Sequence, residues 1–366
     1  MTEARLSGKQ QLARVMFLEV RFMSASISAA VEAEVHDGAP GVAIAIINRG
    51  EVVQTITRGL ANVEWNVPIS PNTIFRIGSI TKQFTAVAIM MLCEDGRLSV
   101  DDPIGKFLPD ISPTLASISL RQLLSHTSGI ANYTDLPEYV PNSRNVVTPK
   151  EISALFENLP LDFEPGSAYR YSNSGYLLLG RILETVTEQS YENYLRDHIF
   201  RPLGMHQTSY LNVAPIVYGR ASGYSTNSDG IFNASFLSMT WPHAAGALGS
   251  SVTDLALWHA ALRDNRLISQ QTLSMMHTPA ILLDGSSCGY GFGWMVGSFN
   301  EHRFVHHAGG INGFSSYMAW FPDDDIAIIL LSNLGGFPIL KVAETILRLF
   351  RTTPVIPLPL HGAGHP

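Results

Sequence analysis

The chain has 366 residues, of which 46% are hydrophobic and 15% charged, so it can bury a sizeable core and is not expected to be disordered. Its formal net charge is −7 and it contains no basic run, which argues against a nucleic-acid or anionic-membrane surface. The two cysteines, Cys93 and Cys288, lack zinc-type spacing, and no apolar run reaches the roughly 18 residues of a membrane helix.

Residues 1–24 are predicted to be a leader or a disordered extension. The apolar stretch VMFLEVRFM at 15–23 is interrupted by Glu19 and Arg21, which a secretory hydrophobic region tolerates poorly, and no clean cleavage site follows. We therefore expect a cytoplasmic location, with the periplasm as the alternative. Met23 is an alternative start, because an orderly helical pattern begins just after it.

The first elements are a short amphipathic helix and a β-hairpin. Residues 24–37 have helical periodicity, and two β-rich runs at about 41–48 and 52–58 flank a turn at Asn48-Arg49-Gly50. A helical pattern then runs from Ser79 to about Asp95. Residues 100–290 are predicted to be mainly helical segments separated by proline and glycine loops.

Strand character returns in the last quarter of the chain. Four strand-like runs occur at 289–296, 303–309, 314–321 and 326–333, with a turn at 322–325 between the last two. A helix is predicted over residues 338–350, and the tail 351–366 is rich in proline and glycine and expected to be loose.

This order of elements predicts an α+β fold. The N- and C-terminal strands would form one antiparallel sheet flanked by the terminal helices, with a mainly helical lobe inserted between them. We expect a single catalytic domain over 25–350, in which residues 25–80 and 288–350 form the sheet lobe and about 81–287 the helical lobe. A small-molecule site is expected between the two lobes.

The stretch Ser79-Ile80-Thr81-Lys82 places a serine three positions before a lysine at the start of a helix. Residues three apart share a helix face, and the positive end of the helix favours a serine alkoxide. The sequence therefore suggests a nucleophile and its base. By itself, however, the S-x-x-K pattern is more often a helix cap followed by a solvated lysine.

Two later stretches complete a set of three motifs. Tyr171-Ser172-Asn173 precedes a strongly helical run, and His307-Ala308-Gly309-Gly310 comes near the end of a predicted strand. Taken alone, the first would be a helix-entry loop and the second a glycine-rich strand end with a surface histidine. In chain order, the three read S-x-x-K, Y-x-N and H-x-G.

This set of motifs resembles the serine hydrolases built on the class C β-lactamase and penicillin-recognising fold, a group that includes D-peptidases, D-aminopeptidases and β-lactamase-like carboxylesterases. The stretches LRQLLSHTSGI, PLGM and DLALWHAAL are also similar to that family. The resemblance covers roughly residues 25–350, and the order of the motifs makes it more specific than S-x-x-K alone.

The resemblance implies a role for each motif residue. Ser79 would form an acyl-enzyme, and Lys82 and Tyr171 would share its proton, with the identity of the base left open. Asn173 would hydrogen-bond to Lys82 or to the acyl side of the substrate. The N–H groups of Ser79 and Gly310 would form the oxyanion hole.

The third motif departs from that of the family's β-lactamases, because His307 occupies the position of a lysine. A neutral histidine holds a substrate carboxylate less well, so the resemblance favours ester or amide cleavage over β-lactam hydrolysis. His307 is a predicted catalytic residue, and Gly309 and Gly310 are predicted to line the substrate site. We rank esters of small acyl groups above peptides, since no basic cluster is evident near the motifs.

Several other functions are retained as alternatives. They are a D-aminopeptidase, a D,D-peptidase, a weak β-lactamase, an acyltransferase and, as a non-enzyme, a penicillin-binding-like sensor or scaffold. The expected partner is a small-molecule ester, amide or lactam. No cofactor and no metal are expected, and the sequence carries no prediction of oligomeric state.

Two rival patterns point elsewhere. GSSCG at 285–289 matches the G-x-S-x-G elbow, which would make Ser287 the nucleophile, but a strand-like run follows it where a helix is needed, and the histidines after the late aspartates lie only in the tail. The second rival pattern is a candidate metal site at three histidines, His302, His306 and His307. On a strand, however, His302 and His306 face one side and His307 the other, without an added acid or cysteine.

Overall fold

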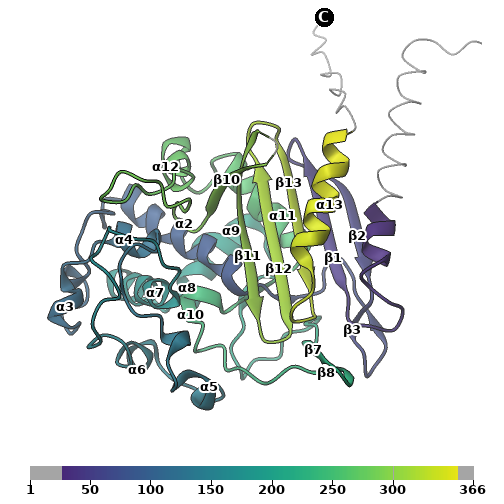
Figure 1. Ribbon diagram of the computed structural model, residues 1–366, viewed down its shortest axis with the longest axis horizontal. Coiled ribbons are helices and arrows are strands. Elements are labelled where there is room, and N and C mark those ends of the chain that lie inside the picture. Colours follow the sequence, from purple (N-terminus) through teal and green to yellow (C-terminus); the bar gives the residue numbers. More distant parts are fainter. Residues whose placement is uncertain (1–26, 300, 353–366) are drawn as a thin grey trace, which may run out of the picture.

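The structure of the protein, a computed structural model, describes residues 27–299 and 301–352. A six-stranded antiparallel sheet carries the terminal helices on one face and the helical lobe on the other (Figure 1). This arrangement confirms the α+β class predicted from the sequence. The predicted leader at 1–24 and all but the first two residues of the predicted tail lie outside the described residues.

The sheet joins strands from both ends of the chain. The predicted hairpin is present, and its turn residues Arg49 and Gly50 have φ angles of 54° and 79°. The strand order is β10-β11-β12-β13-β1-β2. The strands are β1 (Val42–Asn48), β2 (Glu51–Arg58), β10 (Met295–Phe299), β11 (His302–Ile311), β12 (Phe314–Phe321) and β13 (Ile326–Ser332).

The central strands are apolar on both faces because both faces are covered. In β1, Val42, Ile44 and Ile46 pack with α13 (Ile339–Thr352) and with the N-terminal helix at residues 27–32. The alternate residues of β1 belong to the larger core cluster, together with residues of α2 (Thr81–Glu94) and α11 (Val252–Arg263). These two layers make the sheet a rigid support for the residues at its edge.

The helical lobe is built from short helices around α7. Its first half contains η1 (Gly78–Ile80), α2, η2 (Ile104–Lys106), α3 (Pro113–Ala116), α4 (Leu120–Leu124), η3 (Tyr133–Asp135), α5 (Tyr139–Asn142), α6 (Pro149–Ser153) and α7 (Asn173–Thr187). Its second half contains α8 (Tyr191–Leu195), the π-helical η4 (Arg196–Phe200), α9 (Arg201–Leu203), α10 (His243–Gly246), α11 and α12 (Gln270–Met276).

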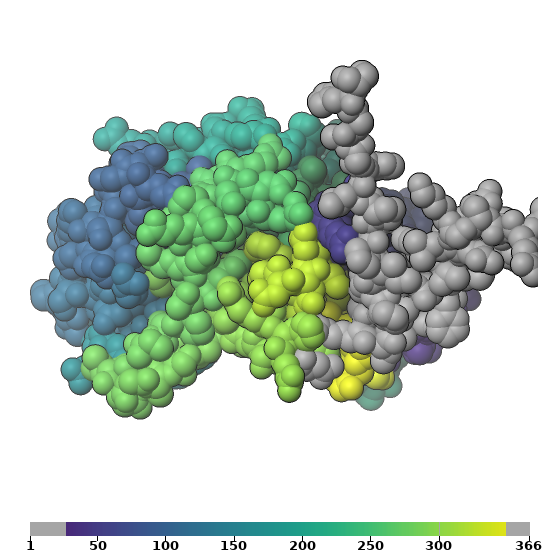
Figure 2. All heavy atoms as spheres, turned by 90° about the horizontal axis from the view of Figure 1, so that it is seen from above, coloured from purple at the N-terminus to yellow at the C-terminus, as the bar shows by residue number. Residues whose placement is uncertain are grey.

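Three small sheets connect the lobes. They are β3 (Leu60–Asn62) with β4 (Val67–Pro68), β7 (Tyr224–Asn227) with β8 (Gly230–Asn233), and a third of β5 (Phe75–Arg76), β9 (Leu248–Ser250) and β6 (Ser209–Tyr210). The third leads directly into η1, so it fixes the approach of the chain to Ser79. Viewed from above, the blue residues of the helical lobe lie at the left, and the purple and yellow residues of the sheet lobe lie from the centre to the right (Figure 2).

One predicted strand is largely wrong. Residues 289–294 form bends around an isolated bridge from Tyr290 to Met295, and β10 begins only at Met295. Gly289 and Gly293 adopt φ angles of 70° and 80°, which favour turns over strands. A Cβ on Gly291 would lie 2.0 Å from the carbonyl oxygen of Met276, so this segment passes against α12 as a turn. Over residues 27–299 and 301–352, the structure has no helix with the length and apolar character needed to span a bilayer.

Candidate active site

Ser79 lies in η1, immediately before α2, and is held against the edge of the sheet. The Ser316 hydroxyl on β12 donates a hydrogen bond of 2.7 Å to the carbonyl oxygen of Ile77. A Cβ added to Gly309 on β11 would lie 3.1 Å from the Ser79 nitrogen, which shows how closely the strand approaches this turn. The sheet therefore fixes the position of Ser79.

Lys82 lies in the first turn of α2, and its side chain is fully buried. Its Nζ is 3.2 Å from Ser79 Oγ, 2.8 Å from Asn173 Oδ1 and 2.9 Å from the carbonyl oxygen of Ala245. No carboxylate among the described residues forms an ion pair with it. The S-x-x-K pattern is therefore not a helix cap with a solvated lysine.

Burial without a counter-charge sets the protonation state of Lys82. Desolvation lowers the pKa of Lys82 well below its ordinary value of 10.5, because an isolated ammonium is costly in a low-dielectric interior. A neutral amine has two N–H donors and one lone pair. The oxygens of Asn173 and Ala245 accept the two donors, which leaves the lone pair for the Ser79 hydroxyl.

Tyr171 lies beside Lys82, with the ring centroid 4.7 Å from Nζ. Its hydroxyl oxygen is buried and has no partner of standard hydrogen-bond geometry among the described residues. Burial raises the pKa of Tyr171 above 10, and the proximity of Ser79 offsets part of that rise. The side chain is therefore a neutral phenol whose proton is available to a group bound at Ser79.

Asn173 is the first residue of α7 and is oriented by its neighbours. Its backbone N–H donates to Asn132 Oδ1 at 2.9 Å, and its Nδ2 donates to Thr134 Oγ1 at 3.2 Å. Because Nδ2 of Asn173 contacts the Thr134 hydroxyl, the amide oxygen Oδ1 of Asn173 faces Lys82. Asn173 therefore joins the helix entry of the second motif to the lysine of the first.

His307 lies on β11 and is 2% exposed, so it is not a surface histidine. Its Nδ1 is 2.7 Å from the carbonyl oxygen of Ala308, which can only accept, so Nδ1 carries the proton. Its Nε2 then accepts from the Tyr290 hydroxyl at 2.9 Å. Burial lowers the pKa of His307 from 6.5 to about 3, so the imidazole is neutral.

The structure brings together all seven predicted site residues: Ser79, Lys82, Tyr171, Asn173, His307, Gly309 and Gly310. Sequence reasoning missed Tyr290, whose hydroxyl contacts His307, and the carbonyl oxygen of Ala245, which contacts Lys82. It also missed His126, whose ring lies 4.3 Å from that of Tyr171. The SHTSG stretch that contains His126 was the available signal for this contact.

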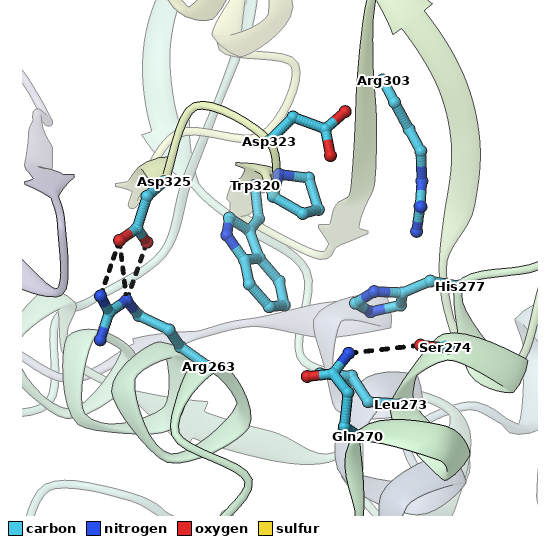
Figure 3. A pocket seen from close by; sticks show the side chains of 10 residues that line it. Arg263, Gln270, Leu273, Ser274, His277, Arg303, Trp320, Asp323 and Asp325 are labelled. Carbon is cyan, nitrogen blue, oxygen red and sulfur yellow. Dashed lines mark hydrogen bonds and ion pairs between the residues drawn. The ribbon is translucent and has the colours of Figure 1, made fainter.

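A pocket of about 230 Å³ opens at Ser79, and we call it the serine pocket. Its walls are neutral: they include Tyr133, Tyr139 and Leu237, with Gly310 and Asn312 on the strand side. A larger pocket of about 480 Å³, here called the sheet-end pocket, lies at the other end of β11 (Figure 3). None of the motif residues lines it, so size alone does not identify the site.

Two arginines form a basic cluster beside the site. Arg76 and Arg220 line a pocket of about 270 Å³, here called the arginine pocket, which shares Asn312 with the serine pocket. The expectation that no basic cluster lies near the motifs is therefore wrong. The two arginines are distant in sequence and meet because Ile74 and Arg220 form a parallel β-bridge.

The rival patterns find no support in the described residues. Ser287 is exposed beside the Ile281–Ser287 bridge, and turns follow it in place of the helix that an elbow requires. His302 lies 3.0 Å from Asp324, whereas His306 stacks on Phe304. Across 27–299 and 301–352, no three histidine, cysteine or acidic side chains are grouped to hold a metal ion.

Together, this fold and this constellation define the β-lactamase and penicillin-binding-protein class of serine hydrolases. The family described as Beta-lactamase matches residues 27–349, and the chain belongs to that family.

Comparisons with individual proteins agree with this membership. The chain is 28% identical over 314 residues to "Protein flp" of Staphylococcus aureus (strain MW2), covering 83% of this chain and 62% of that protein. It is 30% identical over 320 residues to "Penicillin-binding protein 4*" of Bacillus subtilis (strain 168), and the match covers 81% of this chain and 70% of that protein. The solved structure of the D-amino acid amidase of Ochrobactrum anthropi SV3 is similar, with a TM-score of 0.78 and 26% identity. The match covers 90% of this chain and 99% of the amidase chain.

The close approach of β11 to η1 predicts different outcomes for two neighbouring glycines. In Gly309→Ala, the new Cβ would lie 2.2 Å from Ser316 Oγ and 2.3 Å from the carbonyl oxygen of Ile77. We expect a loss of about 1–3 kcal/mol of unfolding free energy, measured by urea denaturation. Gly310→Ala is the control, because its Cβ would meet nothing within 4 Å. Equal stability of the two variants would contradict this description of the contact.

Proposed function

We propose that the protein is a serine hydrolase that cleaves esters of small carboxylic acids through an acyl-enzyme on Ser79. The observation that carries the proposal is the fully buried Lys82 amine, whose Nζ lies 3.2 Å from Ser79 Oγ and has only neutral partners. Such an amine is a general base next to a nucleophile.

In the acylation step, the Lys82 lone pair takes the proton of Ser79 while Oγ bonds to the acyl carbon. The ammonium that forms lies 4.7 Å and 5.4 Å from the ring centroids of Tyr171 and Tyr176, whose faces stabilise a cation. The negative charge on the former carbonyl oxygen is received by the N–H groups of Ser79 and Gly310, which is worth several kcal/mol in such sites.

Tyr171 is the acid for the leaving group. Its raised pKa keeps the hydroxyl protonated, so it can donate that proton to the leaving oxygen as the bond to the acyl carbon breaks. The proton held by Lys82 then neutralises the phenolate. Water completes the cycle in reverse order. It gives a proton to the base as its oxygen bonds to the acyl carbon; the bond from that carbon to Ser79 Oγ then breaks, and the base returns the proton to Oγ.

Charge near the site supports esters over the alternatives. On the side of Tyr171, His307 is neutral, so it offers no cation for the carboxylate of a β-lactam or of a C-terminal leaving residue. No carboxylate lines the serine pocket among the described residues, so the α-ammonium of an amino-acid amide would find no counter-charge there. A neutral ester meets neither difficulty.

Amide hydrolysis is the second candidate. The similarity to the Ochrobactrum anthropi D-amino acid amidase extends over 90% of this chain, and Tyr171 can protonate a leaving amine as well as an alcohol. An acyltransferase would form the same acyl-enzyme and pass the acyl group to an alcohol or amine. A sensor would form the acyl-enzyme and not release the acyl group. Release of more than one product molecule per Ser79 would distinguish an enzyme from a sensor. Formation of a new ester with an added acceptor alcohol would distinguish transfer from hydrolysis.

We expect Ser79→Ala to reduce kcat/KM for p-nitrophenyl butyrate by at least about a thousandfold, because the nucleophile is removed. The matched control is Ser287→Ala, which removes an exposed hydroxyl outside the serine pocket and should retain activity. Circular dichroism verifies that both variants are folded. Full activity in Ser79→Ala, or loss of activity in Ser287→Ala, would move the nucleophile away from Ser79.

The role of Tyr171 predicts a dependence on the leaving group. Tyr171→Phe should fold well, because the lost hydroxyl has no standard hydrogen-bond partner in the described structure. We expect its kcat/KM to fall about tenfold or more further with ethyl butyrate than with p-nitrophenyl butyrate, since ethoxide requires a proton and p-nitrophenolate does not. The same relative loss with both esters would show that Tyr171 is not the acid.

A further inference from the structure

The arginine pocket contains two guanidinium groups and no counter-charge. Arg76 lies on β5 and is partly buried, with its guanidinium carbon 5.9 Å from the ring centroid of Phe314. Arg220 is exposed. Neither side chain forms an ion pair with a described residue. Burial, and then the charge of Arg220, lower the pKa of Arg76 to about 10.

The arginine pocket has no acidic residue in its lining, and one acidic residue beside it is already engaged. Glu64 accepts hydrogen bonds from Tyr224 and Asn233, and Asn233 itself lines the arginine pocket. The other polar lining groups are neutral serine and asparagine side chains. By contrast, Arg121 pairs with Asp101 on the surface of the helical lobe. Two like charges held together without an acid form a site suited to an anion, and a guanidinium fork suits a carboxylate.

The arginine pocket lies on the acyl side of Ser79. The acid Tyr171 and the neutral pair of His307 and Tyr290 mark the side on which the leaving group departs. Along β11, Gly310 is about 10 Å from His307, and the chain continues to Asn312. Asn312 lines the serine and the arginine pockets, so an acyl chain attached to Ser79 and directed away from Tyr171 leads toward the two arginines.

We propose that Arg76 and Arg220 bind a carboxylate at the far end of the acyl group, so that the preferred substrates are half-esters of dicarboxylic acids. This inference rests on the proposed acyl-enzyme at Ser79. It assigns the two ends of the substrate different charges: the leaving alcohol is neutral, and the acyl group is an anion.

The test compares charged and uncharged acyl groups of equal length. The probes are the p-nitrophenyl half-esters of glutaric, adipic and suberic acids, each paired with p-nitrophenyl pentanoate, hexanoate or octanoate. We expect at least one charged ester to have a higher kcat/KM than its partner. Arg220→Gln should reduce this ratio by about tenfold or more, and added salt should reduce it in the wild type, because Arg220 is exposed.

The matched control is Arg303→Gln. Arg303, on β11, is exposed like Arg220, but it lies in the sheet-end pocket, so its loss changes net charge equally without touching the arginine pocket (Figure 3). It should leave the charged-to-uncharged ratio unchanged. A ratio that is the same in the wild type and in Arg220→Gln, for all three chain lengths, would overturn the inference. So would an equal fall in Arg303→Gln, which would indicate an effect of net charge alone.

A binding measurement separates this inference from the proposed function. Calorimetry with Ser79→Ala and monomethyl adipate needs no turnover. If no ester is hydrolysed but the compound binds and Arg220→Gln weakens binding about tenfold, the carboxylate site stands and the esterase function fails. If esters are hydrolysed without any preference for charge and no binding is detected, the esterase function stands and the carboxylate site fails.

Discussion

The site depends on one buried amine without a counter-charge. Lys82 lies between three parts of the chain, namely its own helix α2, the first residue of α7 and the carbonyl group of Ala245 in α10. A charged ammonium there would cost several kcal/mol that no described carboxylate offsets, so the interior favours the neutral form. In the reaction that we propose, the same neutrality makes Lys82 the base for Ser79. Stability and reactivity therefore depend on the same hydrogen bonds.

The scaffold keeps these groups in place through covered, rigid elements. The central strands of the sheet are buried between two layers of helices, and the Ser316 hydroxyl on β12 joins the sheet to the turn that carries Ser79. His307 extends the arrangement along β11 but does not add charge, because Ala308 fixes its proton on Nδ1 and Tyr290 occupies Nε2. In the proposed reaction, the side on which the leaving group departs is consequently neutral, whereas the acyl side opens toward two arginines. This asymmetry is the basis for the substrate class that we infer.

Much of the fold was predictable because its signals are local. The hairpin at residues 42–58 and the strands β12 and β13 follow from β-rich runs separated by turn residues. The three motifs predicted which side chains meet, since their order resembles a known family. The basic pair was not predictable: Arg76 and Arg220 meet through a β-bridge between distant segments, and no local pattern encodes it. Turns at 289–294 were missed because aromatic residues there imitate a strand, although the glycines require positive φ.

The protonation state of Lys82 is the central claim, and nitrogen NMR of lysine Nζ groups measures it directly. The chain has five lysines, so Lys82→Arg assigns the signal by its disappearance. We predict that Lys82 titrates well below 10.5, and that kcat/KM falls with the same midpoint as the pH is lowered and the amine gains its proton. A titration at or above 10.5, with activity retained below it, would show that Lys82 is charged during catalysis and would contradict the account.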